Sequence, residues 1–308
     1  GTSQMDESDN DIPTTLLPPL SGLTNKDFLE ALSLIENGKV YDLDCGRFPG
    51  MPVYEGHPPL QLVNYRTSKG LENQGDHQWW LDSKGTGNNL VEFGWNSEMV
   101  LSSTHSGTHI DALSHVTRGP DDEWFGGANA RENLGDFGPL IYDAASIPPI
   151  IARGVMLDIP GAKGLRALPA HYEITSQDLE DVIKSQGTKI DDSTIVLIRT
   201  GYLSAWPNAE RENFFQAGIN KDAAEYLADL GAVCIAGDTE GLENQPSTMP
   251  GNPFPVHIYL LIDRGIHILE MVYMEDLARD KIFEFCFICL PLKIKGATGS
   301  LVRPIAIV

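Results

Sequence analysis

Three histidines and one aspartate fall within the eleven residues that begin at His105 and end at His115. The chain has eight histidines in all, so this short segment holds a disproportionate share of them. Imidazoles and a carboxylate are costly to bury close together unless they share a cation or a proton. The cluster formed by His105, His109, Asp111 and His115 therefore predicts a chemical site, and the fold has to bring its members together.

The spacing of these residues limits the backbone path between them. A single strand would spread the four side chains over about 33 Å, which is too wide for one ion. A single helix would place His105 beside His109 but would turn Asp111 away from both. A mixed path fits better, with a tight bend at Gly107 and then a short extended step that puts His109 and Asp111 on one side. Two imidazoles and a carboxylate suit Zn²⁺, Mn²⁺ or Fe²⁺, and three close ligands leave positions open for water and substrate.

This motif resembles the signature of the cyclase superfamily, whose members include bacterial kynurenine formamidases and isatin hydrolase. It reads His105-x-Gly107-Thr108-His109-x-Asp111-x-x-x-His115. Further similar segments lie at 52–58, 195–202, 257–270 and 291–306, so the resemblance covers about residues 40–308, with an unfamiliar insertion at about 64–100. Two positions depart from the family pattern: Leu113 stands where proline is common, and the segment 237–243 lacks the usual residues.

The resemblance implies roles for six residues. It implies a first metal ion held by His105, His109 and Asp111. Where a second ion is present, it implies that Asp111 bridges to it and that His257 and Glu270 complete its ligands. It also implies that His115 is the general acid and base; the less favoured alternative is that His115 only orients a ligand. By spacing alone, His257 and Glu270 are as compatible with ordinary packing and a surface carboxylate as with metal binding.

The expected activity is hydrolysis of an amide-like bond in an aryl formamide, a cyclic imide or lactam, or a lactone. A divalent transition metal, Zn or Mn as one or two ions, would activate water, and His115 would move the proton. Two alternatives remain open: a metal-dependent cyclase or dehydratase of secondary metabolism, and a non-catalytic metal-binding protein. Tyr54, Trp80 and Trp95 are candidate substrate contacts, with anchoring of the insertion as the alternative role for its aromatic residues.

Composition narrows the range of partners. A formal charge of −21 argues against nucleic acid and anionic membrane surfaces. No apolar run reaches the roughly 18 residues of a membrane span, and no signal-peptide pattern opens the chain. Four cysteines do not make a disulfide framework in a chain of 308 residues, and we expect Cys286 and Cys289 to be buried in a strand. We therefore expect a cytoplasmic enzyme with a small-molecule substrate, and the resemblance implies a homodimer or homotetramer.

Glycine, proline and helix-capping residues mark the expected boundaries of the domain and of its helices and strands. Residues 1–20 are expected to form a mobile arm, and residues 21–308 a single hydrolase domain that carries the insertion. Helices are expected at 25–37, 175–185 and 221–230, and strands at 40–43, 154–159, 194–199 and 233–236. This pattern predicts a mixed α/β (α+β) domain with a central mixed or barrel-like sheet flanked by helices, and the resemblance implies the swivelling β/β/α type.

Overall fold

The computed structural model of the chain describes residues 17–74, 93–207 and 216–308. The chain divides into two compact units. The larger unit comprises Gly1–Gly46 and Gly107–Val308, and the smaller unit comprises Arg47–Ser106. Most of the expected N-terminal arm, residues 1–16, lies outside the described residues.

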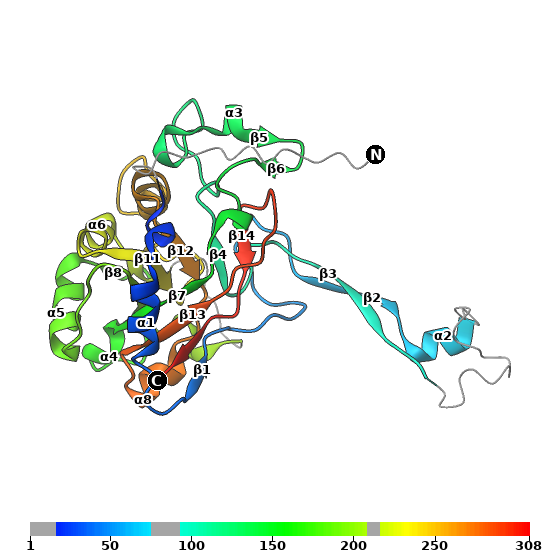
Figure 1. Cartoon of the computed structure of the whole chain (residues 1–308), viewed down its shortest axis with the longest axis horizontal. Helices are drawn as coiled ribbons and strands as arrows, with labels where there is room; N and C mark the ends of the chain where they lie inside the picture. Colours follow the sequence, from blue (N-terminus) through cyan, green and yellow to red (C-terminus); the bar gives the residue numbers. More distant parts are fainter. Residues whose placement is uncertain (1–16, 75–92, 208–215) are drawn as a thin grey trace. The chain divides into compact units, whose positions relative to one another are not determined.

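A mixed β-sheet forms the centre of the larger unit (Figure 1). Within the described residues it has nine strands, in the order β1 (Val40–Asp42), β15 (Ile305–Ile307), β13 (Glu284–Cys289), β7 (Ile150–Asp158), β9 (Thr194–Arg199), β11 (Ala232–Gly237), β12 (His267–Glu270), β4 (His109–Asp111) and β14 (Gly299–Leu301). The neighbours from β7 through β12 pair in parallel, and the strands on either side of them pair antiparallel. The predicted mixed α/β sheet is confirmed.

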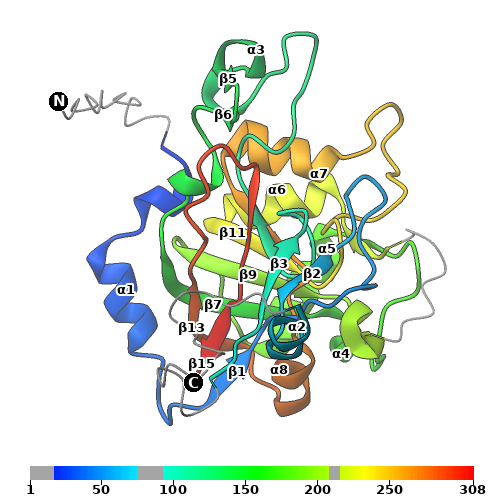
Figure 2. The same ribbon diagram turned by 90° about the vertical axis from the view of Figure 1, so that its right-hand side faces the viewer.

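The central strands are buried on both faces. Ile195 and Leu197 of β9 belong to one apolar cluster, whereas Val196 and Ile198 belong to another. Because successive side chains of a strand point to opposite faces, an unbroken apolar run is needed where both faces are covered. Helices α5 (Ser176–Gln186) and α6 (Lys221–Asp229) pack in the cluster that contains Val196 and Ile198, and α8 (Glu275–Asp280) packs in the cluster that contains Ile195 and Leu197. Figure 2 shows α1 (Asn25–Leu32) on the opposite side of the sheet from α5.

Local capping explains where α5 begins. The Thr175 side chain accepts a hydrogen bond from the Asp178 backbone, and the Asp178 side chain accepts one from the Thr175 backbone. This reciprocal arrangement satisfies backbone donors that have no partner inside the helix. The predicted helix at 175–185 is confirmed.

The expectation for the first helix was partly wrong. The side chain of Thr24 caps α1, through a reciprocal arrangement with Asp27. The helix ends at Leu32 instead of continuing to residue 37, and Leu32 is 45% exposed. Ala31 is the buried residue, because α1 lies against β7 and β13 through a small side chain rather than through an apolar stripe.

Short elements complete the larger unit. They are η2 (Pro19–Gly22), η3 (Phe125–Gly127), α3 (Ala130–Asn133), β5 (Leu134–Gly135), β6 (Gly138–Pro139), η4 (Ala144–Ser146), α4 (Ile159–Ala162), β8 (Glu173–Ile174), η5 (Tyr202–Ala205), β10 (Gly218–Ile219), α7 (Pro255–His257) and the π-helical η6 (Ile258–Arg264). Cys286 and Cys289 are buried free thiols in β13, as expected. None of the helices among the described residues is long and apolar enough to cross a membrane.

The smaller unit contains an antiparallel pair of strands. These are β2 (Gln61–Arg66) and β3 (Ser97–Leu101), which pair with Gln61 opposite Leu101. Helix α2 (Ser68–Gln74) follows β2. The range expected as an insertion, 64–100, therefore begins inside one strand of this pair and ends inside the other.

Candidate metal centre

The backbone around the histidine motif follows the mixed path that the spacing favoured. Gly107 has a φ of 62°, a conformation that glycine adopts without steric cost. The chain then extends as β4, so His109 and Asp111 project from one face of the sheet while Ile110 enters the core on the other face.

Pairing of β4 with β12 adds a second carboxylate to this face. Glu270 lies directly opposite His109 in the antiparallel register, so the two side chains project from the same face. His109 Nε2 is 3.2 Å from Glu270 Oε2 and 3.5 Å from Asp111 Oδ1. The sheet thereby brings together one imidazole and two carboxylates, all of them buried.

A helical segment supplies the next imidazole. His257 ends α7, whose chain continues into η6, and Leu260 and Leu261 of η6 pack in the same apolar cluster as α5 and α6. His257 Nε2 is 3.3 Å from Glu270 Oε1 and 3.8 Å from Asp111 Oδ2. The ligand atoms of Asp111, His257 and Glu270 all lie within 4.8 Å of one another.

His105, His109 and Asp111 all come from the continuous segment 105–111, and all three residues are buried. His105 is the penultimate residue of the smaller unit, where its ring stacks on that of His57 with centroids 5.1 Å apart. His57 was not singled out from the sequence.

The charges of the cluster are mutually dependent. Burial opposes a charged His109, yet the Glu270 and Asp111 carboxylates outweigh burial and raise the pKa of His109. Burial likewise opposes a charged His257, but Glu243 and Glu270 raise its pKa well above the usual value. Burial and Asp111 favour protonation of Glu270, whereas His109 and His257 outweigh them and lower its pKa. Positive charge is needed to keep these carboxylates ionised.

A divalent cation fits this donor set. Glu270 Oε1 is buried and accepts no hydrogen bond of acceptable geometry, although His257 Nε2 lies 3.3 Å away. Imidazole nitrogens and carboxylate oxygens are ligands that Zn²⁺ and Mn²⁺ accept. The side chains can therefore hold a metal in place of the protons that they otherwise share.

The rings of His109 and His257 are each held by a hydrogen bond from Nδ1, while Nε2 faces the carboxylates. His109 Nδ1–H donates to the Gly107 carbonyl oxygen at 2.8 Å. His257 Nδ1–H donates to Glu243 Oε1 at 2.5 Å. Because each acceptor binds the Nδ1 proton, each Nε2 is left as the ligand atom. Glu243 was not singled out from the sequence, because nothing in the sequence pairs it with a residue fourteen positions later.

Two further histidines lie around the cluster. The His115 ring centroid is 6.4 Å from that of His257, and His115 is half-buried. His267 is buried, and its Nδ1–H donates to the Asp111 carbonyl oxygen at 2.8 Å. Burial lowers the pKa of His267 to about 4, so this imidazole is neutral near pH 7. His267 is therefore a hydrogen-bonded core residue.

Comparisons with known proteins agree with this geometry. The Cyclase family model matches residues 41–244. The chain belongs to the cyclase family. Cyclase-like protein 2 of Arabidopsis thaliana is 26% identical over 278 residues, which cover 88% of this chain and 80% of that relative. Isatin hydrolase of Roseibium aggregatum is 29% identical over 231 residues, covering 70% and 75%. A crystal structure of a novel cyclase superposes with a TM-score of 0.80 at 26% identity, covering 94% of this chain and 95% of that one.

Three aromatic residues were predicted as substrate contacts of this cyclase-family chain. Tyr54 is half-buried in the smaller unit, with its ring centroid 6.3 Å from that of His57. Trp95 is half-buried in the same unit, and Trp80 lies outside the described residues. Their roles remain predictions.

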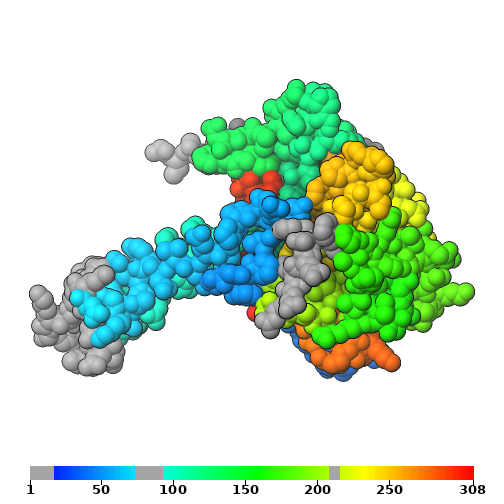
Figure 3. All heavy atoms as spheres, turned by 180° about the vertical axis from the view of Figure 1, so that it is seen from behind, coloured from blue at the N-terminus to red at the C-terminus, as the bar shows by residue number. Residues whose placement is uncertain are grey.

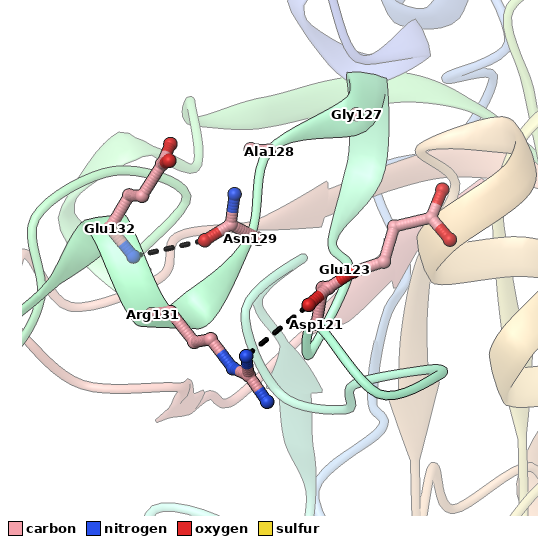
Figure 4. Close-up of a pocket in the computed structure, with 7 residues that line it drawn as sticks. All are labelled: Asp121, Glu123, Gly127, Ala128, Asn129, Arg131 and Glu132. Carbon is pink, nitrogen blue, oxygen red and sulfur yellow. Dashed lines mark hydrogen bonds and ion pairs between the residues drawn. The ribbon is translucent and has the colours of Figure 1, made fainter.

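The larger unit has surface cavities on two of its parts. A cavity of about 700 Å³ adjoins the helix that carries His257, and its lining includes Val116, Phe254, Pro255 and Ile258. Figure 3 shows the two chain segments that form it, around residues 116–119 and 251–255, next to each other on one face. A more polar cavity of about 590 Å³ lies around α3, where Arg131 pairs with Asp121 (Figure 4). Of these two cavities, only the first is lined by a residue of α7, the helix that ends at His257.

Proposed function

We propose that the chain is a metal-dependent hydrolase that cleaves an amide-like bond in a small molecule. The observation that carries this proposal is the buried cluster of His109, Asp111, His257 and Glu270, whose ligand atoms converge from β4, β12 and α7. Membership of the cyclase family and similarity to an isatin hydrolase support it.

Six residues have roles in the proposed site. His105, His109 and Asp111 would hold one ion, and Asp111 would share a second ion with His257 and Glu270. Zn²⁺ and Mn²⁺ are the proposed metals, because the set mixes nitrogen and oxygen donors. When bound, the metal supplies Lewis-acid chemistry and lowers the pKa of water.

Proton transfer is assigned to His115. Its ring lies beside that of His257, at a centroid separation of 6.4 Å, and is half-buried, so it remains open to a water molecule or a substrate. A ring nitrogen of His115 takes the proton from the attacking water and then gives it to the departing nitrogen or oxygen. This return of the proton leaves the histidine in its starting state after each turnover.

The cavity beside α7 favours an apolar or aromatic substrate. Phe254 lines it, and the Phe254 ring meets the His257 ring edge-on with centroids 5.5 Å apart. The name of the isatin hydrolase relative points to an aromatic cyclic amide as its substrate. We therefore propose aryl formamides, cyclic imides or lactams, and aromatic lactones as the classes to test first.

The test combines metal content with turnover in two variants. Asp111→Ala removes the ligand that both groups share, so plasma mass spectrometry should find that stoichiometric Zn or Mn is lost along with hydrolysis. His115→Ala should keep the metal but lose activity by at least about 100-fold, which is the usual contribution of an acid–base group.

A matched control is His171→Asn, because His171 is exposed and its Nδ1–H donates to the Gln245 carbonyl oxygen rather than to a candidate ligand. This variant should retain both metal and activity. Full activity of His115→Ala with its metal bound would remove His115 from the mechanism. A product lighter than the substrate by one water would identify a cyclising dehydration instead of hydrolysis.

A further inference from the structure

The carboxylate of Glu243 accepts hydrogen bonds from both the backbone and the ring of His257. Its side chain is 1% exposed, in the segment between β11 and α7. Glu243 Oε2 accepts a hydrogen bond from the Val256 backbone at 3.1 Å. Glu243 Oε1 accepts two more, from the His257 backbone at 3.0 Å and from His257 Nδ1 at 2.5 Å. A single carboxylate thus holds both the backbone and the ring of a candidate metal ligand.

We propose that Glu243 is the positioning residue of the metal centre. By accepting the Nδ1 proton, it holds the His257 ring in the tautomer whose Nε2 lone pair faces Asp111 and Glu270. By accepting the two backbone protons, it also fixes the place from which that ring projects. The inference rests on the proposed function, because it takes His257 to be a metal ligand.

The position of Glu243 is set independently of His257. Asn244 donates its backbone proton to the Ile219 carbonyl oxygen at 3.3 Å, and Ile219 donates to the Leu242 carbonyl oxygen at 3.2 Å. These bonds tie both neighbours of Glu243 to strand β10. A side chain held in this way is already in place before metal binds, which lowers the ordering cost of binding.

Glutamine cannot reproduce the three bonds. If its amide group stands at the place of Oε1, it donates to His257 Nδ1 and drives the proton to Nε2, where the metal is needed. If the amide group instead takes the place of Oε2, its N–H faces the backbone N–H of Val256. Two donors then meet and neither has an acceptor. Glu243→Gln therefore removes the positioning function with almost no change in volume.

The alternative role for Glu243 is only to accept backbone hydrogen bonds and so stabilise the fold. Another buried carboxylate of the chain serves as the control for this role. Asp238 is fully buried and accepts hydrogen bonds from the backbones of Thr200 and Gly201 at 2.8–3.1 Å, but it contacts no candidate ligand in the described hydrogen bonds. Asp238→Asn should lower the free energy of unfolding without changing metal affinity. Glu243→Gln should lower metal affinity by about 10–100-fold, the range typical for residues that orient a metal ligand.

Metal affinity would be measured on the full chain by competition with a chelator for Zn²⁺. In parallel, ¹⁵N NMR of the histidine rings would be recorded on metal-free protein at a pH high enough to leave the His257 ring neutral, because Glu243 and Glu270 raise its pKa. The expected spectrum shows His257 protonated at Nδ1 in the wild type, with that signature lost in Glu243→Gln and partly restored in Glu243→Asp. Equal Zn²⁺ affinity of wild type and Glu243→Gln, or an equal loss in Asp238→Asn, would overturn the inference. Failure of the wild type to bind any metal would overturn the proposed function, while the ring spectra would still decide whether Glu243 sets the tautomer of His257.

Discussion

At the scale of single residues, the candidate centre depends on what accepts each Nδ1 proton. The Gly107 carbonyl holds His109, the Glu243 carboxylate holds His257, and the Asp111 carbonyl accepts from His267. The first two bonds direct Nε2 atoms towards carboxylates, and the third fixes the backbone that carries Asp111. Histidine chemistry is set by such partners, since either ring nitrogen can carry the proton of a neutral ring.

A buried carboxylate outside the metal-ligand cluster, that of Asp238, should make folding stability depend on pH. Burial raises the pKa of Asp238 to about 6, although Thr200 and the nearby Arg199 oppose the rise. An unfolded aspartate titrates near 3.8, so the folded chain takes up this proton first as pH falls. The Asp238 contribution to the free energy of unfolding is therefore fully present below about pH 4 and is lost as pH rises through about 6, by at most about 3 kcal/mol.

Denaturant unfolding at pH 4.5 and pH 7.5 would measure this effect. Asp238→Asn cannot titrate, so the stability difference between variant and wild type should move in favour of the wild type at the lower pH. Other carboxylates titrate in both proteins and cancel in the difference. A difference that is constant across this range would contradict a raised pKa of Asp238.

At the scale of elements, the site depends on close approach of backbone segments. β10 lies against the segment that carries Glu243, and a Cβ added at Gly218 would stand 2.3 Å from the Leu242 carbonyl oxygen and from the carbonyl carbon of Glu243. Backbone atoms cannot yield as the end of a flexible side chain can. Gly218 is therefore required because the contact leaves no room for a side chain, and not because its backbone has to form a turn.

Gly218→Ala should displace the segment and weaken metal binding together with stability. Overpacking of this kind costs about 1–3 kcal/mol. Gly241→Ala is the matched control, since its added Cβ meets nothing within 4 Å, although it lies two residues from Glu243. Thermal unfolding and Zn²⁺ competition on both variants would test the expectation, which fails if the two variants behave alike.

At the scale of the larger unit, ligands distant in sequence meet on one face of a single sheet. β4, α7 and β12 each supply a part of the cluster, and α7 is separated from β4 by more than a hundred residues. A cation bound to all three elements binds the folded chain and has no equivalent site in the unfolded one. Metal binding and folding are therefore thermodynamically linked.

Metal addition should raise the melting temperature. At a free metal concentration about 100 times the Kd, the stabilisation is about 2.7 kcal/mol, which corresponds to about 4 °C for a chain of 308 residues. Differential scanning fluorimetry of chelated and Zn²⁺-loaded protein would measure it. Asp111→Ala should show no rise, and an equal rise in this variant would mean that the cation binds elsewhere.

Local sequence features predicted much of the framework. The capped helix at 175–185, the strand at 194–199 and the bend at Gly107 follow from interactions within a few residues, which a linear sequence displays directly. The first helix was misjudged because its apolar spacing did not show which face would meet the sheet. Its buried residue, Ala31, is set by the contact with β7 and β13.

The sequence by itself determined the ligand-bearing segment, the mixed α/β class and, through resemblance, the family. It did so because the motif, the strand patterns and the caps are short-range. Only the tertiary structure placed Glu270 opposite His109, brought His257 over the same face and joined Glu243 to the His257 ring. These contacts depend on strand order and register, which are settled by burying both faces of the sheet at once and leave no local signal in the chain.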